Sequence, residues 1–474
     1  MLEKKLLSRV LERAVKKGGD FAEIYVEERE INHVLYEDKR IERINHGMER
    51  GAGIRVVKNG DTGYVYTNDL SEEGLLRAAD TAYHAAGEIK YMDKEIPLKV
   101  KEPLYSFSVK RHPKDVELAE KIGWVKEADE KVREMGESIR QVAVGISDVQ
   151  KKVQIANSDG ELVENEEVRV RAAANVVAYK DGVMQTGYEA IGGTSGWEIL
   201  NENSLNDLAV KAGELAVKLL EARPAPAGKM PVIMAAEAGG TMVHEACGHG
   251  LEADLVQKGL SVYKDKKGEK VASDLVTVID DATLDKKYGS YVFDDEGIHG
   301  QETVLIDKGE LKGYMYDRLA ALRDGVHSTG NGRRESYQYK PVPRMSNTFI
   351  APGKDDPEEI IRSTPYGLLV KKMGGGQVNT TNGDFVFEVK EGYIIENGEV
   401  RELVRGATLS GNGPEALKKI DRVGNDLGFA IGTCGKDGQG VPVSDAQPTI
   451  RITGLTVGGI ADEGLPGIKR IIRK

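Results

Sequence analysis

The chain has little cysteine and lacks any long apolar run. Only Cys247 and Cys434 occur among its 474 residues, so a disulfide framework is excluded and both are expected as thiols or metal ligands. The N-terminal segment interleaves charged and apolar residues without the apolar core of a secretory signal, and no stretch is long enough to cross a membrane. These absences predict a cytoplasmic protein without a membrane partner.

An excess of positive charge is also absent. The formal net charge of −11 argues against a general nucleic-acid-binding surface, so nucleic acid is not expected as a partner. Short basic stretches exist, among them Arg333-Arg334, which belongs either to solvated surface or to a site for a substrate carboxylate. The hydrophobic content of 40% suffices for sizeable cores in two or three domains.

Apolar periodicity and proline-rich connectors predict an α+β fold of three units. Two N-terminal units each have a helix, short antiparallel strands and a second helix, and a larger C-terminal unit, dominated by antiparallel β-sheet, carries a helix over Thr241–Val256. The expected units are residues 1–92, 114–222 and 229–474, separated by a linker over 93–113 and the segment Arg223–Gly228. In the first unit, separate strands are expected over 21–29, 32–37, 40–45 and 52–58, and in the second over 140–147 and 151–157.

Histidine is scarce, yet two of the eight histidines fall within six residues. Residues 244–249 read His-Glu-Ala-Cys-Gly-His, an HExxxH sequence with one residue more between its histidines than the zinc-protease motif HExxH. Neutral imidazoles bind Zn²⁺ well, and a neighbouring carboxylate that is not a ligand can accept a proton from water at the metal. The motif favours a zinc-dependent peptide hydrolase over a helix with unrelated surface histidines.

The interval between His244 and His249 does not suit a regular α-helix. Side chains five positions apart on such a helix point about 140° away from one another, too far to share one metal ion. A π-type turn, in which residues i and i+5 align, or a helix that ends at Gly248 would bring both imidazoles together. The sequence therefore predicts a distorted or broken helix at Gly248.

A catalytic zinc normally has three protein ligands and one open position, so a third ligand is needed. Sequence spacing offers several candidates. Cys247, Glu252 and Asp254 are close in the chain, and Cys434 lies in a glycine-flanked stretch suited to presenting a thiolate. A free cysteine is also commonly a small buried hydrophobic residue, so the residues alone leave this choice open.

Six ordered blocks of the sequence resemble the TldD/PmbA family of metalloproteases, and the resemblance covers essentially the whole chain. The blocks are His244–Asp254, Asp294–Gly297, Thr329–Ser336, Pro343–Thr348, Gly374–Gly376 and Cys434–Gln439. Because the intact HExxxH belongs to the TldD side of the family, whereas the paired TldE (PmbA) subunits generally lack it, the chain is similar to a TldD-type catalytic subunit.

The resemblance implies one Zn²⁺ per chain, bound by His244, His249 and Cys434, with Glu245 as the catalytic glutamate. Cys247 has no role in the family pattern and is interpreted as a packing residue. The resemblance also implies unfolded or flexible peptides as substrates. The implied partner is a TldE (PmbA)-like paralogous subunit, or a second copy of the chain itself.

In the resulting hypothesis, Glu245 acts as general base toward water activated by Zn²⁺. Gly374, Gly375 and Gly376 are candidates to bind an extended substrate through main-chain hydrogen bonds, or else form an ordinary glycine-rich turn. Two other functions remain open: a non-catalytic regulatory or binding protein with a structural zinc, and a hydrolase of non-peptide amides.

Overall fold

The computed structural model describes residues 1–16, 19–86 and 95–459. Parts of the predicted units and connectors, residues 17–18, 87–94 and 460–474, lie outside the described residues. The described chain is a mixed α/β structure with a sheet-rich C-terminal part, which confirms the predicted fold class. No helix within it is long and apolar enough to cross a membrane.

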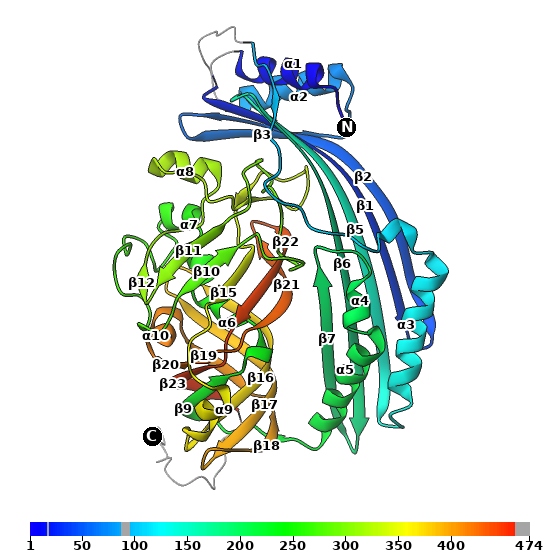
Figure 1. Ribbon diagram of the computed structural model, residues 1–474, viewed down its shortest axis with the longest axis vertical. Coiled ribbons are helices and arrows are strands. Elements are labelled where there is room, and N and C mark those ends of the chain that lie inside the picture. Colours follow the sequence, from blue (N-terminus) through cyan, green and yellow to red (C-terminus); the bar gives the residue numbers. More distant parts are fainter. Residues whose placement is uncertain (17–18, 87–94, 460–474) are drawn as a thin grey trace, which may run out of the picture.

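One long curved sheet occupies the N-terminal half and arcs along one side of the molecule (Figure 1). Its strand order is β3-β2-β1-β5-β6, and both β4 and β7 pair with β6. The strands are β1 (Phe21–Glu37), β2 (Arg40–Lys58), β3 (Asp61–Thr67), β4 (Lys99–Val100), β5 (Ile139–Asn157), β6 (Glu161–Lys180) and β7 (Val183–Gly193). All neighbours are antiparallel except β4 and β6.

The breaks predicted within the strands of this sheet are wrong. β1 is continuous where two strands were expected, and β2 and β5 are continuous in the same way. Because β1 lies between β2 and β5 over most of its length, its backbone groups stay paired whatever the side-chain pattern. Strands from both predicted N-terminal units therefore share one sheet, and the domain boundaries stay a prediction.

Helices cover one face of this sheet in two groups. Near the start of β1, the side chains of Ala22, Ile24 and Val26 join a core with α1 and α2, and near its end Val34 and Tyr36 join a core with α3 and α5. This alternation follows from the two-residue period of a strand. The helices are α1 (Lys4–Val15), α2 (Glu72–Ala85), α3 (Leu118–Arg133), α4 (Ile199–Glu202) and α5 (Leu205–Leu220).

The C-terminal part contains two larger sheets and a small two-stranded one, β13 with β14. One larger sheet has the order β12-β11-β10-β15-β22-β21, and its β15 and β22 are parallel. Its strands are β10 (Val278–Asp281), β11 (Glu302–Asp307), β12 (Glu310–Leu311), β15 (Asn347–Ile350), β21 (Gly428–Lys436) and β22 (Gln439–Gln447), and the small sheet has β13 (Gly332–Arg333) and β14 (Val342–Pro343). This sheet brings β21 and β22, late in the sequence, next to segments that precede them by about a hundred residues or more.

The second large sheet follows the path β16-β9-β23-β19-β17-β18-β8, with β20 beside β23. An additional pairing of β16 with β17 closes part of this path into a ring. Its strands are β8 (Arg223–Pro224), β9 (Gly228–Met234), β16 (Tyr366–Asn379), β17 (Asp384–Glu396), β18 (Glu399–Arg405), β19 (Thr408–Asn412), β20 (Ile420–Val423) and β23 (Ile450–Gly458). Three short helices follow strands of the C-terminal part: α8 (Arg318–Asp324) after β12, α9 (Pro357–Arg362) after β15 and α10 (Gly413–Lys418) after β19.

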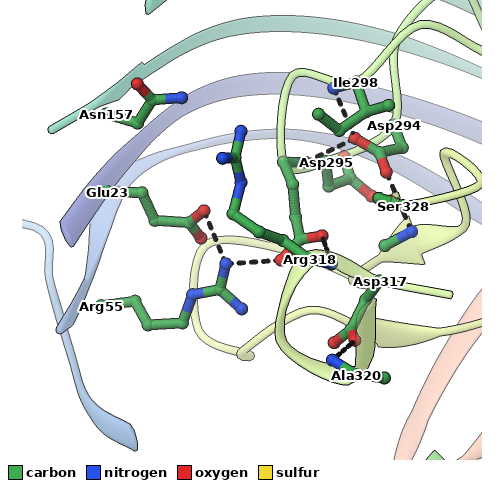
Figure 2. A network of polar contacts seen from close by, with 12 residues as sticks. Glu23, Arg55, Asn157, Asp294, Asp295, Ile298, Asp317, Arg318, Ala320 and Ser328 are labelled. Carbon is green, nitrogen blue, oxygen red and sulfur yellow. Dashed lines mark hydrogen bonds and ion pairs between the residues drawn. The ribbon is translucent and has the colours of Figure 1, made fainter. Parts of the chain in front are cut away.

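A buried charged network joins the curved sheet to the C-terminal part (Figure 2). Arg55 on β2 binds Glu23 across the β1–β2 ladder at 2.8 Å and Glu296 at 2.5 Å, and Arg334 binds Glu23 at 2.6 Å. All four side chains are at most 2% exposed. Arg334 therefore does not belong to the solvated surface, and Arg333 beside it is also buried, which corrects that expectation. The position of Arg334 was not predictable, because Glu23 on the distant strand β1 supplies its carboxylate.

Candidate metal centre

The HExxxH segment is helical but irregular, as predicted. A short helix α6 (Thr241–Val243) leads into a π-helical turn over His244–Gly248 and a 3₁₀ turn over His249–Leu251, before α7 (Ala253–Gln257). Because residues five apart align in a π turn, the two imidazole rings come together, with centroids 4.9 Å apart and planes at 84°. The helix predicted over Thr241–Val256, with a distortion at Gly248, is thus divided into shorter pieces.

Gly248 has right-handed helical dihedrals, with φ of −51° and ψ of −61°, so the turn does not require glycine for its backbone conformation. Glycine is required because there is no room for a side chain at this position. A Cβ atom at this position would lie 2.2 Å from the Sδ atom of Met345, which is fully buried. The absence of a side chain at Gly248 lets Met345 pack directly against the turn.

Cys434 reaches the two histidines from strand β21. Its Sγ atom lies 3.5 Å from Nε2 of His249, and one donor atom from each of His244, His249 and Cys434 falls within 4.8 Å of the others. The structure therefore brings together the three residues that the family resemblance proposes as ligands. Glu252 and Asp254, which the sequence left open as third ligands, are not members of this cluster of donor atoms.

Each histidine is oriented by a carboxylate on its other ring nitrogen. Nδ1 of His244 lies 2.7 Å from Oδ1 of Asp445, and Nδ1 of His249 lies 3.1 Å from Oε2 of Glu252. Such contacts fix the ring tautomer and leave Nε2 as the free donor. Two imidazole nitrogens and one thiolate are the donor types that Zn²⁺ prefers, so the residues present fit that ion.

Lys436 links strand β21, which contains Cys434, to the carboxylates that follow the HExxxH segment. Its ammonium lies 3.2 Å from Glu252 and 2.5 Å from Asp254, and it donates to the Pro343 carbonyl oxygen at 2.9 Å. Because Lys436 follows Cys434 on β21, it ties the Cys434 strand to the carboxylate that holds His249. Sequence reasoning assigned no role to Lys436 or to Asp445. A carboxylate behind each histidine is expected in a zinc site, but spacing along the chain does not identify which one.

The charged groups around the cluster shift the pKa values of its three donor side chains. Burial raises the pKa of Cys434, but His244 and His249 outweigh it and lower that pKa well below its usual value. Burial lowers the pKa of both histidines, but carboxylates and Cys434 raise that of His244 well above its usual value and that of His249 to about 10. The lowered pKa of Cys434 favours its thiolate form, which is the form that binds Zn²⁺.

Glu252 stays ionised within this arrangement. Burial alone raises the pKa of its carboxyl group, but Lys436 and His249 outweigh burial and lower the pKa to about 2. A carboxylate that is ionised at every physiological pH can hold the His249 ring in one orientation.

Cys247 behaves as the packing residue that was predicted. It is fully buried, donates to the Val243 carbonyl oxygen at 3.3 Å, and burial raises its pKa to about 12.

Glu245 is partly buried beside the cluster without being a member of it. Burial raises the pKa of its carboxyl group above the usual 4.5, opposed by the nearby His244 and His249. A carboxylate with a raised pKa is a better proton acceptor than an exposed one at neutral pH. Its backbone lies in the π turn between the two histidines, whose charges act on its carboxyl group.

Gly374, Gly375 and Gly376 lie in strand β16 and not in a turn. Met373 pairs with Val389 and Gly376 with Phe387, so Gly374 and Gly375 form a bulge in the β16–β17 ladder. A Cβ atom at Gly376 would lie 3.5 Å from Cγ of Glu245, which places this backbone beside the glutamate. β9 pairs only with Leu368–Val370 of β16, so the glycine segment is paired on one side only within the described chain.

A helix with two histidines and a glutamate, facing a cysteine on a neighbouring sheet, is the arrangement of a metal-dependent hydrolase. Models of the three PmbA/TldA metallopeptidase domains match the chain: domain 1 over residues 22–86, the central domain over 111–220 and the C-terminal domain over 227–459. The chain therefore belongs to the PmbA/TldD metallopeptidase family.

Individual proteins agree with this assignment. A metalloprotease of Methanocaldococcus jannaschii is 41% identical over 91% of this chain and 96% of its own length. A zinc metalloprotease TldD homolog of Saccharolobus solfataricus is 29% identical over 95% of this chain and 99% of its own. The crystal structure of TldE from Thermococcus kodakarensis shares the fold, with a TM-score of 0.74 at 21% identity, over 96% of this chain and 99% of that one.

Proposed function

We propose that the chain is a zinc-dependent peptidase that hydrolyses unfolded or flexible peptides, with one Zn²⁺ per chain held by His244, His249 and Cys434. The observation that carries the proposal is the convergence of these three donors within 4.8 Å, with Glu245 alongside. A structural zinc site usually has four protein ligands and needs no adjacent glutamate. Three donors with a neighbouring carboxylate fit a catalytic site better.

The residues around the three donor groups have different roles in the proposed reaction. When bound, a zinc ion supplies a Lewis acid that polarises a carbonyl group and acidifies water. Glu245 accepts a proton from the attacking water and returns it to the leaving amine, for which its raised pKa is suited. Asp445 and Glu252 hold the imidazole rings of His244 and His249 in the orientation that keeps their Nε2 atoms available.

The proposed substrate-binding segment is the glycine bulge of β16, Gly374–Gly376. Its backbone lies beside Glu245 and is paired on one side only within the described chain, so an extended peptide can add as a further strand. Main-chain pairing reads an extended conformation more than particular side chains, which supports unfolded peptides as substrates. A folded protein, whose strands are already paired, does not present such a segment.

The proposed partner is a TldE (PmbA)-like paralogue or a second copy of this chain. The support for this is the shared fold with the TldE structure, which covers nearly the whole of both chains. Two chains of one fold can form a closed pair about a twofold or pseudo-twofold axis. The activity is therefore to be measured with the chain alone and with a TldE-like paralogue added.

The decisive experiment compares the zinc-loaded parent with a Glu245→Gln variant on a permanently unfolded polypeptide, such as reduced and carboxymethylated lactalbumin, with products identified by mass spectrometry. We expect Glu245→Gln to retain zinc but to lower the cleavage rate by about 100-fold or more, since a general base contributes that much. Glu237→Gln is the matched control, because Glu237 lies on a nearby turn and is exposed.

Cleavage by Glu245→Gln at the rate of the parent would refute the proposed base. A parent that binds zinc stoichiometrically but cleaves no peptide, alone or with the paralogue, would instead favour a non-catalytic protein with a structural zinc. Cleavage of small amides but not of peptides would favour a hydrolase of non-peptide amides.

A further inference from the structure

A cavity with a volume of about 150 Å³ lies between the curved sheet and the C-terminal part. Arg29, Lys151 and Arg169 line it from strands β1, β5 and β6, and Arg333 and Glu335 line it from the C-terminal part. Tyr291 and Phe293 add aromatic surface. Neither the three proposed zinc ligands nor Glu245 contribute to its wall. The cavity is therefore distinct from the proposed catalytic site.

Arg333 is a buried cation that faces this cavity without a carboxylate partner. Its side chain donates to the carbonyl oxygens of Met345 at 2.5 Å and Pro442 at 2.8 Å, and its guanidinium lies 4.9 Å from the centre of the Tyr291 ring. No acidic group of the described chain lies within ion-pair distance of it. Burial is the largest cause of a lowered pKa at Arg333, so its positive charge is costly where it stands.

The other cations of the wall differ from Arg333, because each has its own carboxylate. Lys151 lies 3.0 Å from Asp295, Arg169 lies 2.6 Å from Glu167, and Arg29 lies 3.1 Å from Glu49. Arg334, next to Arg333 in sequence, binds Glu23. The excess positive charge of the wall is thus localised on Arg333.

Glu335 is an anionic group in the same wall that also has no partner of opposite charge among the described residues. Its Oε2 atom accepts a hydrogen bond from the backbone N–H of Gly440 at 2.6 Å, and no lysine or arginine of the described chain lies within ion-pair distance of its carboxylate. Arg333 ends strand β13, and Glu335 follows two positions later. The two line one cavity without forming an ion pair with each other, so a cation-binding and an anion-binding group are available together.

We propose that this cavity binds a free amino acid in its zwitterionic form, with the carboxylate at Arg333 and the ammonium group at Glu335. One small ligand would then compensate both unpaired charges through charge-assisted hydrogen bonds. The volume of about 150 Å³ lies below the range for drug-sized ligands. A single amino acid is therefore the size of ligand that we expect.

The aromatic walls favour a small apolar side chain, such as that of alanine, over a second charge. A further anionic group on the ligand would have to be desolvated without a free cationic partner, since the remaining cations are already paired. Amino-acid binding in this cavity uses neither the metal nor Glu245. Binding of the amino acid and hydrolysis of peptides can therefore be tested independently of one another.

The test is ligand-observed saturation-transfer NMR, with titration, on the full chain. L-alanine is compared with N-acetyl-L-alanine, which lacks the ammonium group, and with L-alaninamide, which lacks the carboxylate. We expect L-alanine to bind about tenfold or more tightly than either analogue, because each loses one charge-assisted hydrogen bond. Glu335→Gln should remove the preference over N-acetyl-L-alanine, and Arg333→Met the preference over L-alaninamide.

If Arg333→Met does not fold, Glu335→Gln alone tests the proposal. This variant is expected to fold, because the glutamine oxygen can still accept the hydrogen bond from Gly440. The control is Glu302→Gln, at an exposed position of β11 outside the cavity wall, which should leave all three affinities unchanged. Equal binding of the three ligands, no binding of L-alanine, or an unchanged preference in Glu335→Gln would overturn the proposal.

Discussion

The Sγ atom of Cys434 lies 3.5 Å from the Nε2 atom of His249, although the two residues are 185 positions apart in the chain. One stands on strand β21, and the other begins the 3₁₀ turn that follows the π-helical turn. The donor cluster therefore forms only when the sheet containing β21 has packed against the HExxxH segment. A local peptide containing His244 and His249 would present two of the three donors at most.

Zinc content distinguishes the two cysteines. Cys434→Ser should lose most of the zinc bound by the parent, because a neutral hydroxyl is a poor substitute for the thiolate that the two histidines stabilise. Cys247→Ser should keep its zinc, because Cys247 bonds to the Val243 carbonyl oxygen and stands outside the donor cluster. Inductively coupled plasma mass spectrometry of purified, dialysed protein measures both. Unaltered zinc in Cys434→Ser would contradict the assignment.

Lys436 should affect metal affinity without being a ligand. In Lys436→Met, Glu252 loses its ion-pair partner, and the His249 ring is held less firmly. We expect zinc affinity to fall about 10-fold to 100-fold, the usual effect of losing an outer contact, as measured by competition with a chromophoric chelator. The absorption bands of bound Co²⁺ should shift as well. Lys418→Met, at an exposed position of α10, is the control and should change neither quantity.

The glycines of β16 should respond differently to a single methyl group. A Cβ at Gly376 would lie 2.2 Å from the fully buried Phe387 ring, so Gly376→Ala should lower the free energy of unfolding by about 1–3 kcal/mol and impair cleavage. A Cβ at Gly375 meets no atom within 4 Å. Gly375→Ala should therefore unfold like the parent, to within about 0.5 kcal/mol, in urea titrations.

If a peptide adds along this edge, Gly375→Ala should raise KM for peptide cleavage while its stability is unchanged, because the methyl group meets the substrate and not the protein. Steady-state kinetics on a single fluorogenic peptide provide the measurement. An unchanged KM in Gly375→Ala would place the substrate elsewhere.

The acid limb of the pH profile should report Glu245. A general base acts only when ionised, and burial raises the pKa of Glu245 above 4.5, so kcat/KM should fall as the pH drops through a value above 4.5. The profile is to be recorded with zinc content determined at each pH, so that loss of metal is not mistaken for protonation. An acid limb below pH 4.5 with zinc retained would assign the base to another group.

The buried network between sheet and C-terminal part should be important for stability. Glu23 binds both Arg55 and Arg334 at an unexposed position, and removing one member of such a set costs about 3–5 kcal/mol. Glu23→Gln should lower the free energy of unfolding by about that amount in urea titrations. Glu49→Gln removes a half-exposed partner of Arg29, and its effect should stay within about 1 kcal/mol. Equal effects of the two variants would contradict the importance of the buried network.

Much of the local structure follows from the sequence because it depends on neighbours in the chain. The five-residue interval between His244 and His249 required a distorted helix, and the π turn supplies it. The class of fold followed from alternating strands and amphipathic helices in the same way. The unbroken strands β1, β2 and β5 were not predictable, because pairing with neighbours on the sheet, and not side-chain alternation, keeps them extended.

The candidate metal centre likewise has features that follow from the sequence and features that depend on tertiary packing. The sequence by itself determined the donor types, the adjacent glutamate and the family, and it narrowed the third ligand to a few residues. The tertiary structure decided the contacts that depend on sheet packing: Cys434 beside His249, Asp445 behind His244, and the Lys436–Glu252 ion pair. It also buried Arg334 against Glu23 of strand β1, from the other end of the chain. Sequence spacing carries no information on such distances, because packing of distant segments brings these groups together.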